Sequence, residues 1–218
     1  MANTSGLSIV PFQGAGSINR RKNTTTSAID NVNVLSKNID FSFCNYTNTE
    51  DIKNEVPRAS PRKSKLPDME NKKASTKSVR LNNNKLCDVS CIKDTLEAHT
   101  VNPLEVEWID LSFNELTNID PVIMDFERLQ ILYFHGNKIS DLTQIEKLRN
   151  LRHLRKLTLH GNTIENQKMY KQYVLSTLPQ LHCLDFSLIT NADRITAATW
   201  NKIQNKGPKK QKPKDDED

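Results

Sequence analysis

The 218-residue sequence has few of the features that mark membrane, secreted and fibrous proteins. It has no apolar run near the roughly 18 residues of a membrane helix, so we expect no membrane span. Its start lacks an apolar segment behind a basic one, so we expect no secretory signal. Only 4 cysteines and 6 glycines are present, which excludes a disulfide scaffold and collagen and favours reduced thiols.

Motifs that carry catalysis or bind nucleotides are missing as well. The sequence has no Gly-x-Ser-x-Gly, no phosphate loop, no His-Glu-x-x-His and no dinucleotide fingerprint. Cys87 and Cys91 have no second pair of ligands, so no zinc site is expected there. We therefore predict a protein that is not an enzyme and that uses no cofactor.

Positive charge is distributed unevenly along the chain. The 31 basic and 26 acidic residues give a net charge of +5. Residues 58–77 hold seven basic and two acidic residues, whereas residues 78–205 hold 14 basic and 15 acidic ones. The basic excess thus belongs to a short linker, with a small contribution from the tail 206–218, and the part between them is almost neutral.

Apolar residues are concentrated in the second part of the chain. Leu, Ile, Val and Phe make up 20% of residues 1–75 and 31% of residues 76–205. A segment of low apolar content cannot offset the entropy lost on ordering. We predict that residues 1–75 form a largely disordered N-terminal arm that contains the basic linker 58–77. Residues 206–218 are predicted to be a charged disordered tail.

A repeat dominates residues 76–189. Four units share the pattern apolar-x-apolar-x-x-Asn, and a fifth begins at Leu181 but has Ile189 where the Asn belongs. The four units close on Asn84, Asn114, Asn137 and Asn162. The alternating apolar residues before each Asn predict a short strand. Each Asn amide can satisfy backbone donors and acceptors that the following turn leaves unpaired, so we expect an asparagine ladder through the core.

This pattern predicts an α/β fold, a right-handed leucine-rich-repeat solenoid with a parallel concave sheet. Helical segments are expected at 121–129, after a cap at Asp141, and within 87–103. About five units and a cap are expected to fill residues 76–189.

The end of the repeats differs from the rest and predicts a helical cap. Thr190 and Asp193 resemble a capping box that opens a C-terminal helix over 190–205. We expect Ile195, Trp200 and Ile203 to face inward from that helix and seal the solenoid.

Strand residues that point away from the core are predicted to line the concave face and to bind a partner there. Trp108, Ile131 and Tyr133 are apolar or aromatic residues on a face expected to meet water, which is typical of an interface hot spot. The remaining predicted contact residues are polar: Arg80, Asp110, His135, Lys156, Thr158, His160 and Asp185.

Two alternatives compete with partner binding at this face. Ile39, Phe41 and Phe43 alternate as in a strand, and the N-terminal segment that carries them is a candidate cover for the apolar patch. His135 and His160 occupy the same position in adjacent units, where strands about 4.8 Å apart would bring two imidazoles near one ion. A third ligand in register is not evident nearby, so the sequence predicts no metal site.

A resemblance to a known family is found in three stretches, residues 108–114, 157–162 and 173–185. The repeats, and the closing run from Tyr173 to Asp185, resemble the SDS22-like leucine-rich-repeat family over about residues 39–205. The resemblance implies a non-enzymatic adaptor or scaffold in the cytoplasm. Because relatives in this family often serve cilia, the expected partners are proteins of the axoneme or of microtubules.

The same resemblance leaves other functions open. One is a ribonucleoprotein scaffold of the U2 snRNP A-prime type, and another is a phosphatase regulator of the SDS22 type. Nucleic acid is the rival partner, because the basic linker and tail can contact phosphates. No aromatic residues are interleaved in the linker, however, and base stacking is what holds single-stranded RNA.

Overall fold

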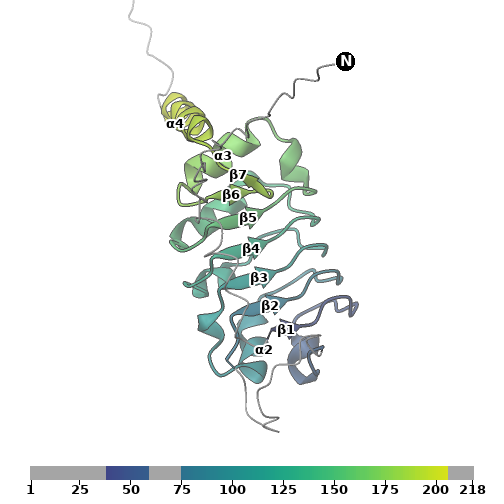
Figure 1. Cartoon of the computed structure of the whole chain (residues 1–218). Helices are drawn as coiled ribbons and strands as arrows, with labels where there is room; N and C mark the ends of the chain where they lie inside the picture. Colours follow the sequence, from purple (N-terminus) through teal and green to yellow (C-terminus); the bar gives the residue numbers. More distant parts are fainter. Residues whose placement is uncertain (1–37, 59–74, 206–218) are drawn as a thin grey trace, which may run out of the picture. The chain divides into compact units, whose positions relative to one another are not determined.

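The structure is a computed structural model that describes residues 38–58 and 75–205. In these residues a seven-stranded sheet runs in the order β1 to β7, so each strand pairs with the next one along the chain (Figure 1). The strands are β1 (Ile39–Asp40), β2 (Ser78–Arg80), β3 (Trp108–Asp110), β4 (Ile131–Tyr133), β5 (Lys156–Thr158), β6 (Cys183–Leu184) and β7 (Ser187–Leu188). Pairs from β1 to β6 are parallel and the last pair is antiparallel. The predicted mixed α/β fold with a parallel sheet is confirmed.

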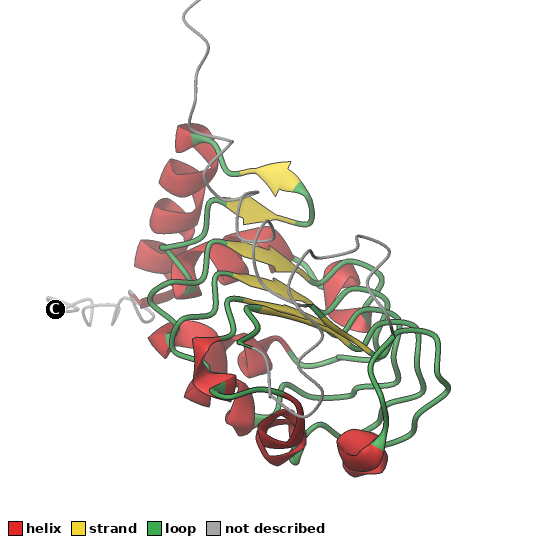
Figure 2. Ribbon diagram, turned by 60° about the horizontal axis from the view of Figure 1, so that its bottom comes forward, coloured by secondary structure: helices red, strands yellow, loops and turns green. Residues whose placement is uncertain are grey.

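Helical segments return the chain from one strand to the next, and most of them lie on one side of the sheet (Figure 2). They are η2 (Glu50–Asn54), α2 (Ile92–His99), η3 (Pro103–Glu105), η4 (Pro121–Asp125), η5 (Leu142–Asn150), η6 (Thr163–Asn166), α3 (Tyr170–Thr177) and α4 (Asn191–Asn205). Asp120 and Asp141 start η4 and η5 by accepting hydrogen bonds from the backbone of Val122 and Thr143, both at 2.9 Å. No helix within the described ranges is long and apolar enough to cross a membrane.

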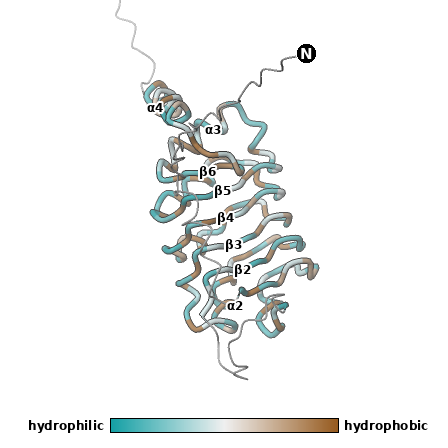
Figure 3. The backbone as a smooth tube through the Cα atoms, in the orientation of Figure 1, coloured by the Kyte–Doolittle hydropathy of each residue, from teal (hydrophilic) through white to brown (hydrophobic). Residues whose placement is uncertain are grey.

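The core lies between the sheet and these helical segments. Apolar residues of successive units recur at corresponding places along the chain (Figure 3). Ile109, Leu132 and Leu157 from neighbouring strands pack in one cluster with Phe126 and Phe134, and all five are completely buried. The period-two alternation of each strand therefore separates a buried side from the opposite face, as the repeat pattern predicts.

The solenoid extends further toward the N-terminus than the repeat pattern indicated. Ile39 pairs with Val79 in parallel register, and both Ile39 and Phe41 are buried in the core. The structure thus makes residues 38–58 the first unit of the solenoid, with β1 as the edge strand of the sheet, rather than part of a disordered arm or a cover over the concave face. The repeat pattern does not reveal this first unit, because Cys44 occupies the Asn position and the surrounding segment is polar. The other predicted disordered parts, 1–37, 59–74 and 206–218, lie outside the described residues.

The C-terminal end closes with a hairpin. Asp185 and Phe186 have φ angles of 49° and 60°, as the two central residues of a type I′ turn do, and β7 turns back along β6. The fifth unit therefore ends the sheet instead of continuing it. Beyond it, Thr190 and Asp193 exchange backbone and side-chain hydrogen bonds of 2.9 and 3.2 Å, which confirms the predicted capping box.

One expectation about helix α4 is wrong. Ile195 and Ile203 are 67% and 64% exposed, so they do not seal the solenoid. Ala197 is buried in their place, and Trp200 packs edge-on against Tyr173 of α3. The helix thus meets α3 through Trp200 and through the ion pair of Asp193 with Lys171, while its two isoleucines remain exposed.

Candidate partner-binding face

The strand register brings the predicted contact residues together on the sheet face opposite the core. Trp108 pairs with Ile131 and Ile131 with Lys156, while the neighbouring row runs from Arg80 through Asp110 and Tyr133 to Thr158. These rows follow from the parallel register and match the repeat alignment. The face therefore has an apolar and aromatic centre at β3 and β4 with charged residues on the flanking strands β2 and β5.

Six aromatic and imidazole rings form a continuous set of contacts on this face, which we call the aromatic cluster. Its members are Trp108, Phe113, Tyr133, His135, His160 and Phe186. Trp108 and Tyr133 form a T-shaped pair with ring centroids 5.9 Å apart, and Tyr133 and His135 form another at 6.0 Å. Edge-on contacts at these distances are favourable for aromatic pairs.

Two members of the cluster were missed by the sequence analysis. Phe113 contacts His135 at 5.0 Å, and Phe186 contacts Tyr133 at 5.5 Å and His160 at 5.6 Å. Both residues have a positive φ and lie just beyond a strand, Phe113 after β3 and Phe186 at the tip of the last hairpin. A repeat pattern does not show which non-glycine residues adopt a positive φ. The aromatic residue type was therefore the only feature of the sequence that could indicate that these two residues join the cluster.

Trp108 and Ile131 are less exposed than the sequence predicts. Each is only 8% exposed, although both lie outside the main core cluster. The Arg80 guanidinium carbon lies over the Trp108 ring, 4.9 Å from its centroid. The indole Nε1 of Trp108 is buried and has no hydrogen-bond partner among the described residues. A buried donor left unpaired costs about 1–3 kcal/mol.

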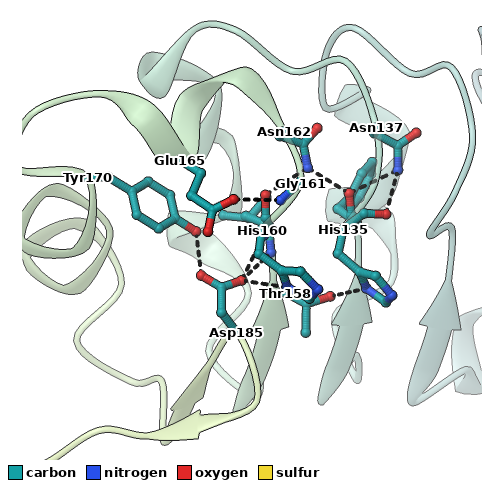
Figure 4. A network of polar contacts seen from close by, with 11 residues as sticks. His135, Asn137, Thr158, His160, Gly161, Asn162, Glu165, Tyr170 and Asp185 are labelled. Carbon is teal, nitrogen blue, oxygen red and sulfur yellow. Dashed lines mark hydrogen bonds and ion pairs between the residues drawn. The ribbon is translucent and has the colours of Figure 1, made fainter.

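Asp185 lies in the turn after β6 rather than on the fifth strand, and it is the centre of a polar network (Figure 4). Its Oδ1 accepts hydrogen bonds from the backbone N–H groups of Leu159 at 2.6 Å and His160 at 2.9 Å. Its Oδ2 accepts a hydrogen bond from the Tyr170 hydroxyl at 2.8 Å. Burial, together with the Asp185 carboxylate, raises the pKa of Tyr170, so the phenol stays protonated and keeps donating.

His135 and His160 stack face to face, with ring centroids 4.6 Å apart and an angle of 11° between the ring planes. The Nδ1 of His135 lies 2.8 Å from the Thr158 hydroxyl. Burial, with a smaller contribution from His160, lowers the pKa of His135. No group of three or more metal-ligating side chains occurs in the part of the chain that the structure describes.

The four repeat asparagines link each unit to the one before it. Asn137 accepts a hydrogen bond from the Leu116 backbone at 3.0 Å and donates to the carbonyl groups of Leu111 and Phe134, both at 2.9 Å. Equivalent bonds to the preceding unit are made by Asn84, Asn114 and Asn162. These side chains are buried, so they hold the face in place and do not contact a partner.

Comparison with known proteins agrees with this architecture. Residues 114–213 match the family model described as Leucine-rich repeat. The chain is 44% identical over 180 residues to leucine-rich repeat-containing protein 51 of Bos taurus, which covers 83% of this chain and 92% of the relative. It is 31% identical over 94 residues to U2 small nuclear ribonucleoprotein A' of Mycosarcoma maydis, covering 43% of this chain and 38% of that protein.

A solved structure supports the fold alone. The Drosophila melanogaster SNF/U2A' complex contains a chain that aligns with a TM-score of 0.54 at 20% identity, covering 73% of this chain and 99% of that one. The long match at 44% identity, by contrast, extends over most of both proteins. The chain therefore belongs to the leucine-rich-repeat family, together with leucine-rich repeat-containing protein 51.

Proposed function

We propose that the chain is a non-enzymatic adaptor that binds partner proteins on the sheet face that carries the aromatic cluster. The observation that supports this most is the cluster itself, which joins rings from β3, β4 and the last hairpin on the side of the sheet away from the core. Solenoids use extended concave faces for binding. Tryptophan and tyrosine at the centre of such a face are the residue types that dominate binding energy.

We further propose that the chain belongs to the SDS22-like branch and acts in the cytoplasm at the ciliary axoneme. The support is the resemblance of residues 173–185 to the closing segment of that branch. The neutral charge of residues 78–205 also fits a protein partner better than a nucleic acid.

Crosslinking mass spectrometry on isolated cilia, with the tagged full chain, tests both proposals. We expect crosslinks from Lys156 to a second axonemal protein that co-purifies with doublet microtubules. Trp108→Ala should reduce recovery of that protein about thirtyfold, the equivalent of losing a hot spot of about 2 kcal/mol. The matched control is Ile203→Ala, an exposed apolar residue on α4. Equal recovery with both variants, each shown to be folded by circular dichroism, would contradict binding at this face.

A ribonucleoprotein scaffold is the second candidate. It is favoured by the 31% identity over 94 residues to a U2 small nuclear ribonucleoprotein A' and by the basic residues of 58–77. Fluorescence anisotropy with a labelled RNA hairpin tests it. Affinity that falls steeply with salt and is lost after neutralising the lysines and arginines of the linker would support an RNA role. Binding that is absent at low salt would remove this candidate.

A further inference from the structure

The aromatic cluster has two halves that differ in exposure. Trp108 is 8% exposed, whereas Phe113 and Phe186 are 53% and 60% exposed. These two phenylalanines contact the stacked imidazoles. Phe113 meets His135 with ring centroids 5.0 Å apart, and Phe186 meets both histidines at 5.6 Å. We call the set of Phe113, His135, His160 and Phe186 the open half of the cluster.

Carboxylates lie beside the open half, and no lysine or arginine among the described residues forms an ion pair with them. Asp185 Oδ1 is 3.4 Å from His160 Nδ1. Asp110 Oδ1 accepts both hydrogen bonds from Ser112, at 3.0 and 2.6 Å, and its Oδ2 accepts none from the part of the chain that the structure describes. Burial lowers the pKa of His135, although both carboxylates oppose that shift, so this imidazole is neutral at pH 7. The open half is therefore a negatively charged surface at neutral pH.

The other end of the same face shows which side chain suits such a surface. The Arg80 guanidinium carbon lies 4.9 Å from the Trp108 ring centroid, and its Nη1 is 3.9 Å from the Asp40 carboxylate. A cation, an aromatic ring and a carboxylate thus occur together on adjacent strands. Arg80 pairs with Asp110 across β2 and β3, but its guanidinium lies with Trp108 and Asp40 instead. The open half has the rings and the carboxylates of this arrangement, and a partner can supply the cation.

A guanidinium fits these groups better than other side chains do. It is planar, it stacks on aromatic faces, and it donates several hydrogen bonds in a geometry that matches a carboxylate. An acidic side chain would be repelled by Asp110 and Asp185. An apolar side chain would cover the free Asp110 oxygen without giving it a donor, which is unfavourable for a charged group.

We propose that the open half binds an arginine side chain of the partner protein, with the guanidinium over the exposed rings and directed toward Asp110. This assignment rests on the proposed function, because it names the chemistry that the partner brings to the face. Trp108 and Arg80 form the closed part of the surface, and the open half provides the pocket-like contact of rings and charge that anchors the partner.

A peptide titration tests the site before the partner is identified. The probes are two capped pentapeptides, acetyl-Gly-Ser-Arg-Ser-Gly-amide and the same peptide with citrulline in place of arginine. Citrulline keeps the planar shape and most of the hydrogen-bond donors but has no charge. NMR spectra of the full-length chain, labelled with ¹³C in the rings of its 5 histidines, report binding. Single His→Gln variants assign the five signals.

We expect the arginine peptide to shift the His135 and His160 signals in a saturable way, with a dissociation constant on the order of 1 mM. The citrulline peptide should bind at least about fivefold more weakly, because it lacks the cation. The signal of His153, an exposed histidine, should not move. Equal binding of the two peptides would overturn the proposal, and so would the lack of a saturable shift with the arginine peptide at about 20 mM.

Variants locate the binding energy. Phe113→Leu and Phe186→Leu keep apolar bulk but remove the aromatic face, so each should weaken the arginine peptide about threefold to tenfold. Asp110→Asn should weaken it by a similar factor, because the charge is lost. The matched control is Phe43→Leu, since Phe43 has the place of Phe113 in the first unit, with a φ of 58° and 60% exposure, but lies outside the cluster. Circular dichroism checks that each variant is folded, and affinities equal to that of the control would overturn the proposal.

Capture from cilia separates the arginine site from the adaptor function. Lower recovery of the partner with Trp108→Ala, Phe186→Leu and Asp110→Asn would support both. If only Trp108→Ala lowers recovery, the adaptor function stands and the arginine anchor is overturned. If the arginine peptide binds selectively but none of the three variants lowers recovery, the arginine site stands and the adaptor function at this face fails.

Discussion

The carboxylate of Asp185 accepts a hydrogen bond from the backbone N–H of His160 at 2.9 Å and another from Leu159 at 2.6 Å. In the earlier units, the N–H group equivalent to that of Leu159 donates to a backbone carbonyl of the next strand, as Phe134 donates to Thr158 at 2.9 Å. Here the Asp185 side chain supplies the acceptor instead, because the chain turns back after β6. This carboxylate thus caps the end of β5.

Asp185→Ala should lower the free energy of unfolding by about 2–4 kcal/mol, because it leaves two backbone donors and the Tyr170 hydroxyl without their acceptor. Asp185→Asn keeps one acceptor oxygen and tolerates the positive φ of 49°, so its loss should be smaller. Urea denaturation measures both. The control is Asp125→Ala, which removes an exposed ion pair with Lys93 and should cost less than about 1 kcal/mol. Equal losses for Asp185→Ala and the control would refute the capping role.

Asn137→Ala should cost about 2–4 kcal/mol of unfolding free energy. The substitution leaves the Leu116 N–H and the carbonyls of Leu111 and Phe134 without their partner inside the core. Asn118→Ala is the matched control, because that asparagine is exposed. Chemical denaturation of both variants decides the point, and a loss below about half a kcal/mol for Asn137→Ala would contradict the ladder.

The stacked imidazoles predict a fall in stability at mildly acidic pH. Burial lowers the pKa of His135 below its ordinary value of 6.5, so the unfolded chain takes up the proton first as pH falls. Stability should be fully present above pH 6.5 and decline below it until the folded-state pKa is reached. The charged or titratable groups acting on His135 are His160, Asp110 and Asp185.

Thermal unfolding between pH 5 and 8 measures this dependence. His135→Gln should flatten the profile below pH 6.5, since its amide can still bond to Thr158 but does not titrate. His153→Gln, at an exposed histidine, should leave the profile unchanged. A His135→Gln profile that matches the parent chain would mean that another group causes the decline.

Gly136 is under two separate constraints. Its φ is +68°, and an added Cβ would lie 2.7 Å from Cδ1 of Phe113. Gly136→Ala should therefore cost more than the roughly 1–2 kcal/mol of the left-handed conformation alone. In a Phe113→Ala background the cost should fall to that conformational part. A double-mutant cycle by urea denaturation measures the coupling, and a cost unchanged by Phe113→Ala would show that the ring is not the obstacle.

The sequence by itself determined the repeating part of this protein. The recurring short strands, the buried asparagines, the caps at Asp141 and Thr190 and the row from Trp108 to Lys156 all follow from local pattern. These features repeat or are local, so periodicity and residue type suffice to place them. Most of the candidate face is therefore readable from the sequence.

Only the tertiary structure decided how the sheet begins and ends. Cys44 stands in an asparagine position, so the first unit escapes the pattern, while its strand is held by pairing with Val79. At the other end, positive φ angles at Asp185 and Phe186 turn the chain back and bring Phe186 onto Tyr133 and His160. An edge unit has a neighbour on one side only, so its conformation depends on side-chain hydrogen bonds and packing that no repeat pattern encodes.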